Sequence, residues 1–349
     1  MDMAQAADVN LRWLLRPIQE YLADPAMTDL HINAPGVAFV DRGRGMERVS
    51  LPYSFGALED VAINAAALTR QDIAEDVPIV STRFPDGHRV QIVRPPAVAG
   101  GQFAFSIRQP KAESWTPDQL AKSGVFASAV GRGRGKSVNQ DRLLELYRAG
   151  EWQAFLTLAV ASRLNLVFSG TVGSGKTHNL RAFTHAIPKT WRLVTIEDMP
   201  ELIGLPHENV VSLFYSKGGQ SVANVTPEAL VEAALRMGMD GLLNQELRDE
   251  AAYAYLNALE SGHWGMTTVH ADNAEQARGR ICGLIKKHPS GRHLNDADVM
   301  VSLQRTINVV VHCARDGNRR FIEQVLYEPV AQSASPDATR RDAMALAAE

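Results

Sequence analysis

Residues 164–177, LNLVFSGTVGSGKT, decide how the rest of the sequence is interpreted. The apolar run from Leu164 to Phe168 predicts a buried strand, and Gly170 to Thr177 is a complete GxxxxGK[ST] loop directly after it. We expect a helix from Lys176. Glycines let successive backbone N–H groups wrap a phosphate chain, and the positive end of the following helix lies at the same place. The stretch therefore predicts a nucleotide-binding α/β domain.

The loop residues have separate expected roles toward ATP and Mg²⁺. Lys176 should contact the β and γ phosphates, and the hydroxyl of Thr177 should bind Mg²⁺. Gly173 and Gly175 leave room for the phosphate chain. The full set of expected loop contacts is Gly170, Gly173, Ser174, Gly175, Lys176, Thr177 and His178.

Further strands and helices alternate after the loop. Short apolar segments at 192–196, 241–245 and 266–269 alternate with helical patterns at 226–237 and 250–260. Buried strands separated by helices predict a parallel sheet covered on both faces. We expect the RecA-like form of this α/β fold.

Polar residues end three of the predicted strands. Glu246 follows the strand 241–245, an acidic cluster beginning at Glu197 follows 192–196, and His270 follows 266–269. The carboxyl ends of parallel strands meet at the edge where open α/β folds bind ligands. Because a loop that binds phosphate still needs a carboxylate for magnesium and water, Glu246 is the best candidate. His270 is expected to hydrogen-bond the γ phosphate.

The chain divides into four parts by residue composition and apolar spacing. Residues 1–110 combine helical spacing with alternating strands and predict a smaller α+β domain, and 149–330 form the predicted ATPase domain. Residues 111–148 are rich in Gly, Ser and basic side chains and predict a linker, while 331–349 predict a polar tail. The linker is either a solvated tether or a contact for an anionic lipid surface, through Arg132, Arg134 and Lys136.

Composition narrows the classes of function. The 349 residues have a net charge of -3 and therefore lack the basic excess of a dedicated nucleic-acid binder. Direct contact with nucleic acid remains an alternative only through a local basic patch. Two distant cysteines exclude a four-cysteine zinc site within one chain and fit a cytoplasmic setting. No apolar stretch approaches 18 residues, so we expect peripheral membrane association.

Four motifs in order resemble those of one family. SGTVGSGKT, RLVTIEDMPEL, ALRMGMDGLLNQELRDEAAYAYLNALESGH and GMTTVHADN are similar to the Walker A, Asp box, Walker B and His box of the secretion ATPase superfamily. FPDGHRVQIVRPPAVAGGQFAFSIRQP and SKGGQSVANVTPEALVEAALRM resemble its traffic ATPases of type IV secretion and conjugation, the VirB type. The resemblance covers about Tyr21 to Val330.

The resemblance implies a homohexameric ATPase with nucleotide between its two domains. It would work at the cytoplasmic side of the inner membrane, with other type IV secretion ATPases and inner-membrane components as partners. Glu197 matches the Asp-box residue that helps activate water, Glu246 the Walker B glutamate near magnesium, and His270 the His-box position. Arg89 and Arg108 match N-terminal-domain arginines that reach the nucleotide phosphates in the family. Arg236 and Arg248 match arginines that flank Walker B and could supply charge at the subunit boundary.

The sequence departs from the family pattern at a few positions. Val172 and His178 replace threonines, Gly238-Met239 replace a basic-proline pair, and Gln245 replaces the glycine before Glu246. These changes leave the turnover rate open. Two alternatives also stay open at this point: a nucleotide-binding ring scaffold with little turnover, and a DNA translocase with a RecA-like core.

Overall fold

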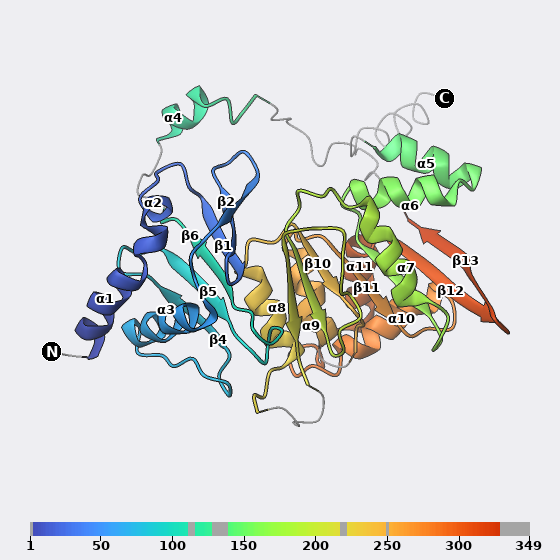
Figure 1. Cartoon of the computed structure of the whole chain (residues 1–349). Coiled ribbons are helices and arrows are strands. Elements are labelled where there is room, and N and C mark those ends of the chain that lie inside the picture. Colours follow the sequence, from blue (N-terminus) through green and yellow to red (C-terminus); the bar gives the residue numbers. More distant parts are fainter. Residues whose placement is uncertain (1–2, 111–115, 128–138, 217–221, 249–250, 329–349) are drawn as a thin grey trace.

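The computed structural model describes residues 3–110, 116–127, 139–216, 222–248 and 251–328. Figure 1 shows two domains side by side, an N-terminal one up to β6 and a C-terminal one from α5 onward. The predicted tail and the basic residues Arg132, Arg134 and Lys136 lie outside the described residues. Within those described ranges, no helix is both long and apolar enough to cross a bilayer.

The N-terminal domain is a six-stranded antiparallel sheet with helices packed on it. The strand order is β3-β2-β1-β6-β5-β4. Alternating apolar residues such as Leu30, Ile32 and Phe105 face Leu11 and Leu58 of the helices, and all five are buried. The elements are α1 (Met3–Leu14), α2 (Gln19–Leu22), α3 (Phe55–Leu68), β1 (Asp29–Ala34), β2 (Val37–Asp41), β3 (Met46–Ser50), β4 (Ile79–Arg83), β5 (Arg89–Val93) and β6 (Ala104–Arg108).

The C-terminal domain contains a seven-stranded sheet in the order β13-β12-β7-β11-β10-β8-β9. Its neighbours pair in parallel, except that β13 is antiparallel to β12. The α/β fold class predicted from the sequence, with its smaller α+β domain, is confirmed. The strands are β7 (Leu166–Gly170), β8 (Leu193–Glu197), β9 (Val210–Phe214), β10 (Gly241–Asn244), β11 (Gly265–Val269), β12 (Val309–Asp316) and β13 (Arg319–Tyr327).

Helices cover both faces of this sheet because alternate strand residues point to opposite sides. Val167 contributes to the core beneath one set of helices, while its neighbours Leu166 and Phe168 contribute to the core beneath the other. The first set is α8 (Pro227–Leu235), α9 (Ala251–Glu260), α10 (Ala274–Ile285) and α11 (Asp296–Thr306), and the second is α5 (Gln140–Ala149), α6 (Trp152–Ala161) and α7 (Lys176–Phe183).

The predicted linker, 111–148, ends earlier in the structure. Helix α5 begins at Gln140, and its Leu143 and Leu146 are buried in the core of the C-terminal domain. The apolar spacing of the sequence from 140 onward therefore belongs to the ATPase domain. Within the predicted linker, the short helix α4 (Pro117–Lys122) lies apart from both domains and starts at a Thr116 capping box.

The N-terminal domain packs along the β9 edge of the C-terminal sheet. At one end of β9, Asn33 Nδ2 donates to Asn209 Oδ1 at 2.9 Å, and at the other end the Phe214 N–H donates to the Ala97 carbonyl at 2.9 Å. Arg192, fully buried just before β8, donates to Asn33 Oδ1 at 2.8 Å. These contacts fix the orientation of the two domains within one chain.

The same boundary explains one departure from the family pattern. Gly238 has φ +62°, and a Cβ there would come within 2.9 Å of the ring of His31 in the N-terminal domain. Glycine is therefore favoured at this position because both the backbone conformation and the approach of His31 exclude a larger residue.

Candidate active site

The phosphate loop has the shape that its glycines predict. Gly170, at the end of β7, has φ +148°, and a Cβ on it would collide with the carbonyl oxygen of Cys313 and with Ser174 Oγ. Gly173 and Gly175 also have positive φ, and Gly175 is the N-cap of α7. A side chain at Gly170 would force the loop away from β12. The loop is thus seated between β7, β12 and the start of α7.

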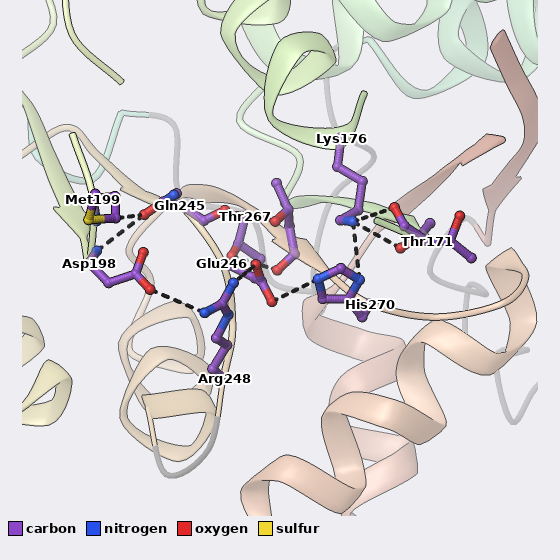
Figure 2. Close-up of polar contacts among 11 residues, drawn as sticks. Thr171, Lys176, Asp198, Met199, Gln245, Glu246, Arg248, Thr267 and His270 are labelled. Atoms are coloured by element: carbon purple, nitrogen blue, oxygen red, sulfur yellow. Dashed lines mark hydrogen bonds and ion pairs between the residues drawn. The ribbon is translucent and has the colours of Figure 1, made fainter. Parts of the chain in front are cut away.

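Lys176 is held inside the loop. Its side chain is largely buried, and Nζ donates to the carbonyls of Gly170 and Thr171 at 2.9 Å each. Nζ also lies 3.3 Å from Nδ1 of His270 (Figure 2). Burial lowers the pKa of Lys176, and the charge of Glu246 opposes that change. The ammonium group is therefore placed at the end of the loop where β7 and β11 meet.

Glu246 is at the centre of a chain of polar contacts. Its Oε1 lies 3.3 Å from His270 Nε2, and its Oε2 accepts a hydrogen bond from Arg248 at 2.6 Å. Arg248 also pairs with Asp198 at 3.1 Å, and Figure 2 shows this chain running from Asp198 to Lys176. Burial, reinforced by the carboxylate of Asp198, raises the pKa of Glu246 to about 7 despite the opposing charge of Lys176.

His270 bridges the carboxylate and the lysine as a neutral ring. Burial lowers its pKa, and the nearby charges of Lys176 and Arg248 lower it further. A neutral imidazole can accept a hydrogen bond from Lys176 on one nitrogen and donate to Glu246 from the other. His270 thus connects the loop after β7 with the end of β10.

Gln245 connects the end of β10 to the acidic segment after β8. Its Oε1 accepts a hydrogen bond from the backbone N–H of Asp198 at 3.1 Å, and its own carbonyl accepts from Thr268 Oγ1 at 2.8 Å. A glycine here, as in the family pattern, would lack the first contact. The substitution therefore adds a link between two strand ends without removing a catalytic group.

Glu197 has a different place from the one the sequence suggested. Its side chain is fully buried, and it accepts hydrogen bonds from Thr195 Oγ1 at 2.6 Å and from the N–H groups of Glu201 and Leu202 at 2.8 and 2.7 Å. A carboxylate with these three donors and no exposed surface orders the turn after β8.

Glu201 is the acidic residue of this segment that faces the phosphate loop. It lines a cavity of about 760 Å³ together with Thr177, His178 and Arg181. Its charge also acts on the pKa of both Lys176 and Glu246. The sequence contained a signal for this position of Glu201. The residue belongs to the same acidic cluster as Glu197 but lies beyond the strand, where a side chain is not buried in the core.

A second cavity lies on the other side of the loop. It measures about 650 Å³ and is lined by Gly170, Thr171, His270 and Arg280, among others. Arg280 carries no signal in the sequence, because a single arginine within a helical pattern has no distinguishing spacing. Arg280 is therefore a site residue that emerges from the structure and not from the sequence pattern.

Three of the predicted arginines lie away from the chain's own phosphate loop. Arg108 pairs with Asp29 at 3.2 Å, opposite Arg89 in the β5–β6 register, and Asp29 approaches Gly238 before β10 begins. Arg236 donates to the Glu232 carbonyl at the end of α8, also ahead of β10. The phosphate loop lies at the opposite ends of the strands, where β10 terminates. The four residues of β10 separate its two ends by roughly 13 Å. Of the four predicted arginines, only Arg248 joins the site.

Comparisons with known proteins show the family to which the chain belongs. Residues 138–346 match the family model described as "Type II/IV secretion system protein". The chain is 39% identical over 308 residues to "Protein VirB11" of Rhizobium radiobacter, covering 87% of this chain and 90% of the relative. It is 34% identical over 332 residues to "Type IV secretion system protein VirB11" of Brucella suis, covering 93% and 91%.

A solved structure is similar over both domains. The crystal structure of the VirB11 ATPase from the Brucella suis type IV secretion system, in complex with sulphate, superposes with a TM-score of 0.88 at 32% identity. The superposition covers 99% of this chain and 100% of that one. The two-domain fold is therefore shared over its full length.

Proposed function

This chain belongs to the type II/IV secretion system protein family as a secretion ATPase related to VirB11, and from this premise we propose that it hydrolyses ATP with Mg²⁺ to power type IV secretion or conjugative transfer. The observation that carries the proposal is the contact of Lys176 with the phosphate loop on one side and with His270 on the other. A phosphate chain seated in the loop would meet this ammonium group at its γ end.

The residues present suit a magnesium ion bound together with nucleotide. Mg²⁺ in such sites uses one or two carboxylates, a hydroxyl and substrate phosphates, not a protein cage. The part of the chain that the structure describes contains no cage of three or more His, Cys, Asp or Glu. Thr177 and Glu246 would hold the ion, which would neutralise charge on the β and γ phosphates.

In this proposal Glu201 orients the attacking water, the role that the family resemblance implies for Glu197. Its carboxylate lines the cavity beside Thr177, whereas that of Glu197 is buried in backbone hydrogen bonds. In this proposal Glu197 fixes the turn that presents Glu201, and His270 transmits the state of the γ phosphate to Glu246.

Arg89 and Arg108 act on the nucleotide of another copy in a homohexameric ring. Arg89 begins β5 and Arg108 ends β6, so the two are paired at the same end of these antiparallel strands, and both are exposed. An arginine fork suits phosphate contact across such a boundary. The ring would dock at the cytoplasmic face of the inner membrane against other secretion ATPases, inner-membrane components and anionic lipid.

ATP hydrolysis by the purified full chain tests the proposal. Lys176→Ala should abolish phosphate release in the presence of Mg²⁺, while Lys189→Ala, an exposed lysine outside the site, should match the wild type. Equal rates of phosphate release by Lys176→Ala and wild type would refute the proposed ATPase activity. Tight ATP binding without phosphate release would favour a ring scaffold, and salt-dependent stimulation by DNA would favour a translocase.

A further inference from the structure

Helix α10 carries two arginines in contrasting surroundings. Arg278 is buried and donates to Glu328 Oε2 at 2.7 Å and to the Ile307 carbonyl at 3.0 Å. Arg280, two residues later, is exposed and has no hydrogen bond or ion pair among the described residues. Arg278 therefore stabilises the packing of the helix, whereas the guanidinium of Arg280 is available to bind something else.

Arg280 lies between the phosphate loop and the buried carboxylate. It lines the cavity of about 650 Å³ next to Gly170 and Thr171, and also an adjoining cavity of about 240 Å³ next to Glu246. His270 is the other residue that lines both. A group extending beyond Lys176 toward Glu246 would thus come into the space that Arg280 borders.

The other arginine at this end of the site is already engaged. Arg248 makes ion pairs with both Glu246 and Asp198, so its contact with a phosphate would break two ion pairs with partly buried carboxylates. Arg280 has no such partner to lose. Its charge acts on both Glu246 and His270, which is consistent with its position beside them.

From this geometry we propose that Arg280 is a catalytic residue that contacts the γ phosphate of ATP bound in its own chain's phosphate loop. The proposal rests on the ATP hydrolysis proposed above. The oxygen of water forms a bond to the γ phosphorus, and the bond from that phosphorus to the β–γ bridging oxygen breaks. The water transfers its proton to the carboxylate that orients it, that of Glu201 in this proposal. Negative charge grows on the departing oxygen and is spread over the γ oxygens, where a guanidinium donates two N–H groups.

Two substitutions separate catalysis from folding and binding. Arg280→Ala should lower kcat by about 10³-fold, because arginines in this role contribute on that order or more. Its affinity for a fluorescent ADP analogue should change less than about threefold, since ADP has no γ phosphate. Arg280→Lys should recover part of kcat, because it keeps the charge but loses the fork. Arg305→Ala, an exposed arginine in the last turn of α11, is the matched control and should match the wild type.

Trapping with aluminium fluoride gives a readout that a structural role would not move. Wild type, Arg280→Ala, Arg305→Ala and Lys176→Ala are incubated with the ADP analogue, Mg²⁺ and aluminium fluoride, which mimics the transferring phosphoryl group. We expect trapped nucleotide for wild type and Arg305→Ala only, and loss of trapping in Arg280→Ala with its oligomeric state unchanged by light scattering. Retained trapping in Arg280→Ala, or a loss of activity explained by altered assembly, would overturn the assignment.

The two proposals fail in different ways. If Lys176→Ala hydrolyses ATP as fast as wild type, the proposed function is wrong. If Lys176→Ala is inactive while Arg280→Ala keeps wild-type kcat, the proposed function stands and the role of Arg280 is refuted.

Discussion

Replacing Glu246 by glutamine should stabilise the nucleotide-free protein, and only at neutral and alkaline pH. Glutamine has nearly the same shape as glutamate and can still accept a hydrogen bond from Arg248, which lies 2.6 Å from the carboxylate. The change removes a charge that the folded protein holds with only 12% of the side chain exposed. The gain arises because ionised carboxylates are unfavourable when buried.

The size of the effect follows from the pKa of Glu246, which burial raises from 4.5 to about 7. Between these values the folded protein keeps a proton that the unfolded chain has released, so the free energy of unfolding falls as pH rises through this window. The loss amounts to about 3 kcal/mol above pH 7. Glutamine does not titrate, so Glu246→Gln should equal wild type near pH 4.5 and exceed it by that amount at pH 8.5.

Thermal unfolding followed by fluorescence at pH 4 and pH 8.5, without nucleotide or Mg²⁺, measures the difference. For a domain of this size about 3 kcal/mol corresponds to a Tm higher by about 6–12 °C in Glu246→Gln at pH 8.5. The control is Glu275→Gln, an exposed carboxylate in the first turn of α10, where loss of the charge should not raise Tm at pH 8.5. Parallel pH profiles for wild type and Glu246→Gln would refute the assigned burial of this charge.

Two further perturbations test the loop and the acidic segment. Gly170→Ala should lower the free energy of unfolding by about 3 kcal/mol, because its Cβ would collide with β12 and its φ is disfavoured for alanine. The control is Gly283→Ala, in open space within α10, which should raise the free energy of unfolding slightly. Equal denaturant midpoints for the two variants would contradict the packing of the loop. Glu197→Gln should lower Tm because it weakens three buried hydrogen bonds, while Glu201→Gln should leave Tm within about 1 °C and reduce kcat by at least about tenfold. A larger loss of kcat in Glu197→Gln at full stability would return the catalytic role to that residue.

Much of the fold could be predicted from local sequence. The strand before Gly170, the helix from Lys176 and the later strand–helix alternation depend on apolar spacing and glycine placement, which act over a few residues. Strand ends could also be located, so Glu246 and His270 were predicted at the same edge of the sheet, and the structure places them 3.3 Å apart.

Other features depend on packing between distant segments. The prediction did not include strands β4, β9, β12 and β13. It also assigned α5 to the linker, although Leu143 and Leu146 reach the C-terminal core. The orientation of the N-terminal domain depends on buried polar contacts such as Asn33 with Arg192. Neighbouring residues in the sequence cannot specify partners more than a hundred positions away.

The sequence by itself determined that this protein binds nucleotide in a GxxxxGK[ST] loop on an α/β sheet, because that loop needs only glycines, a lysine and a threonine at fixed spacing. Only the tertiary structure decided how the charged residues are placed around it. Glu197 is buried in backbone hydrogen bonds, Arg108 and Arg236 have partners near the start of β10, and the packing of α10 brings Arg280 to the cavity beside Gly170. Whether a charge is paired, buried or free depends on segments that are remote in sequence.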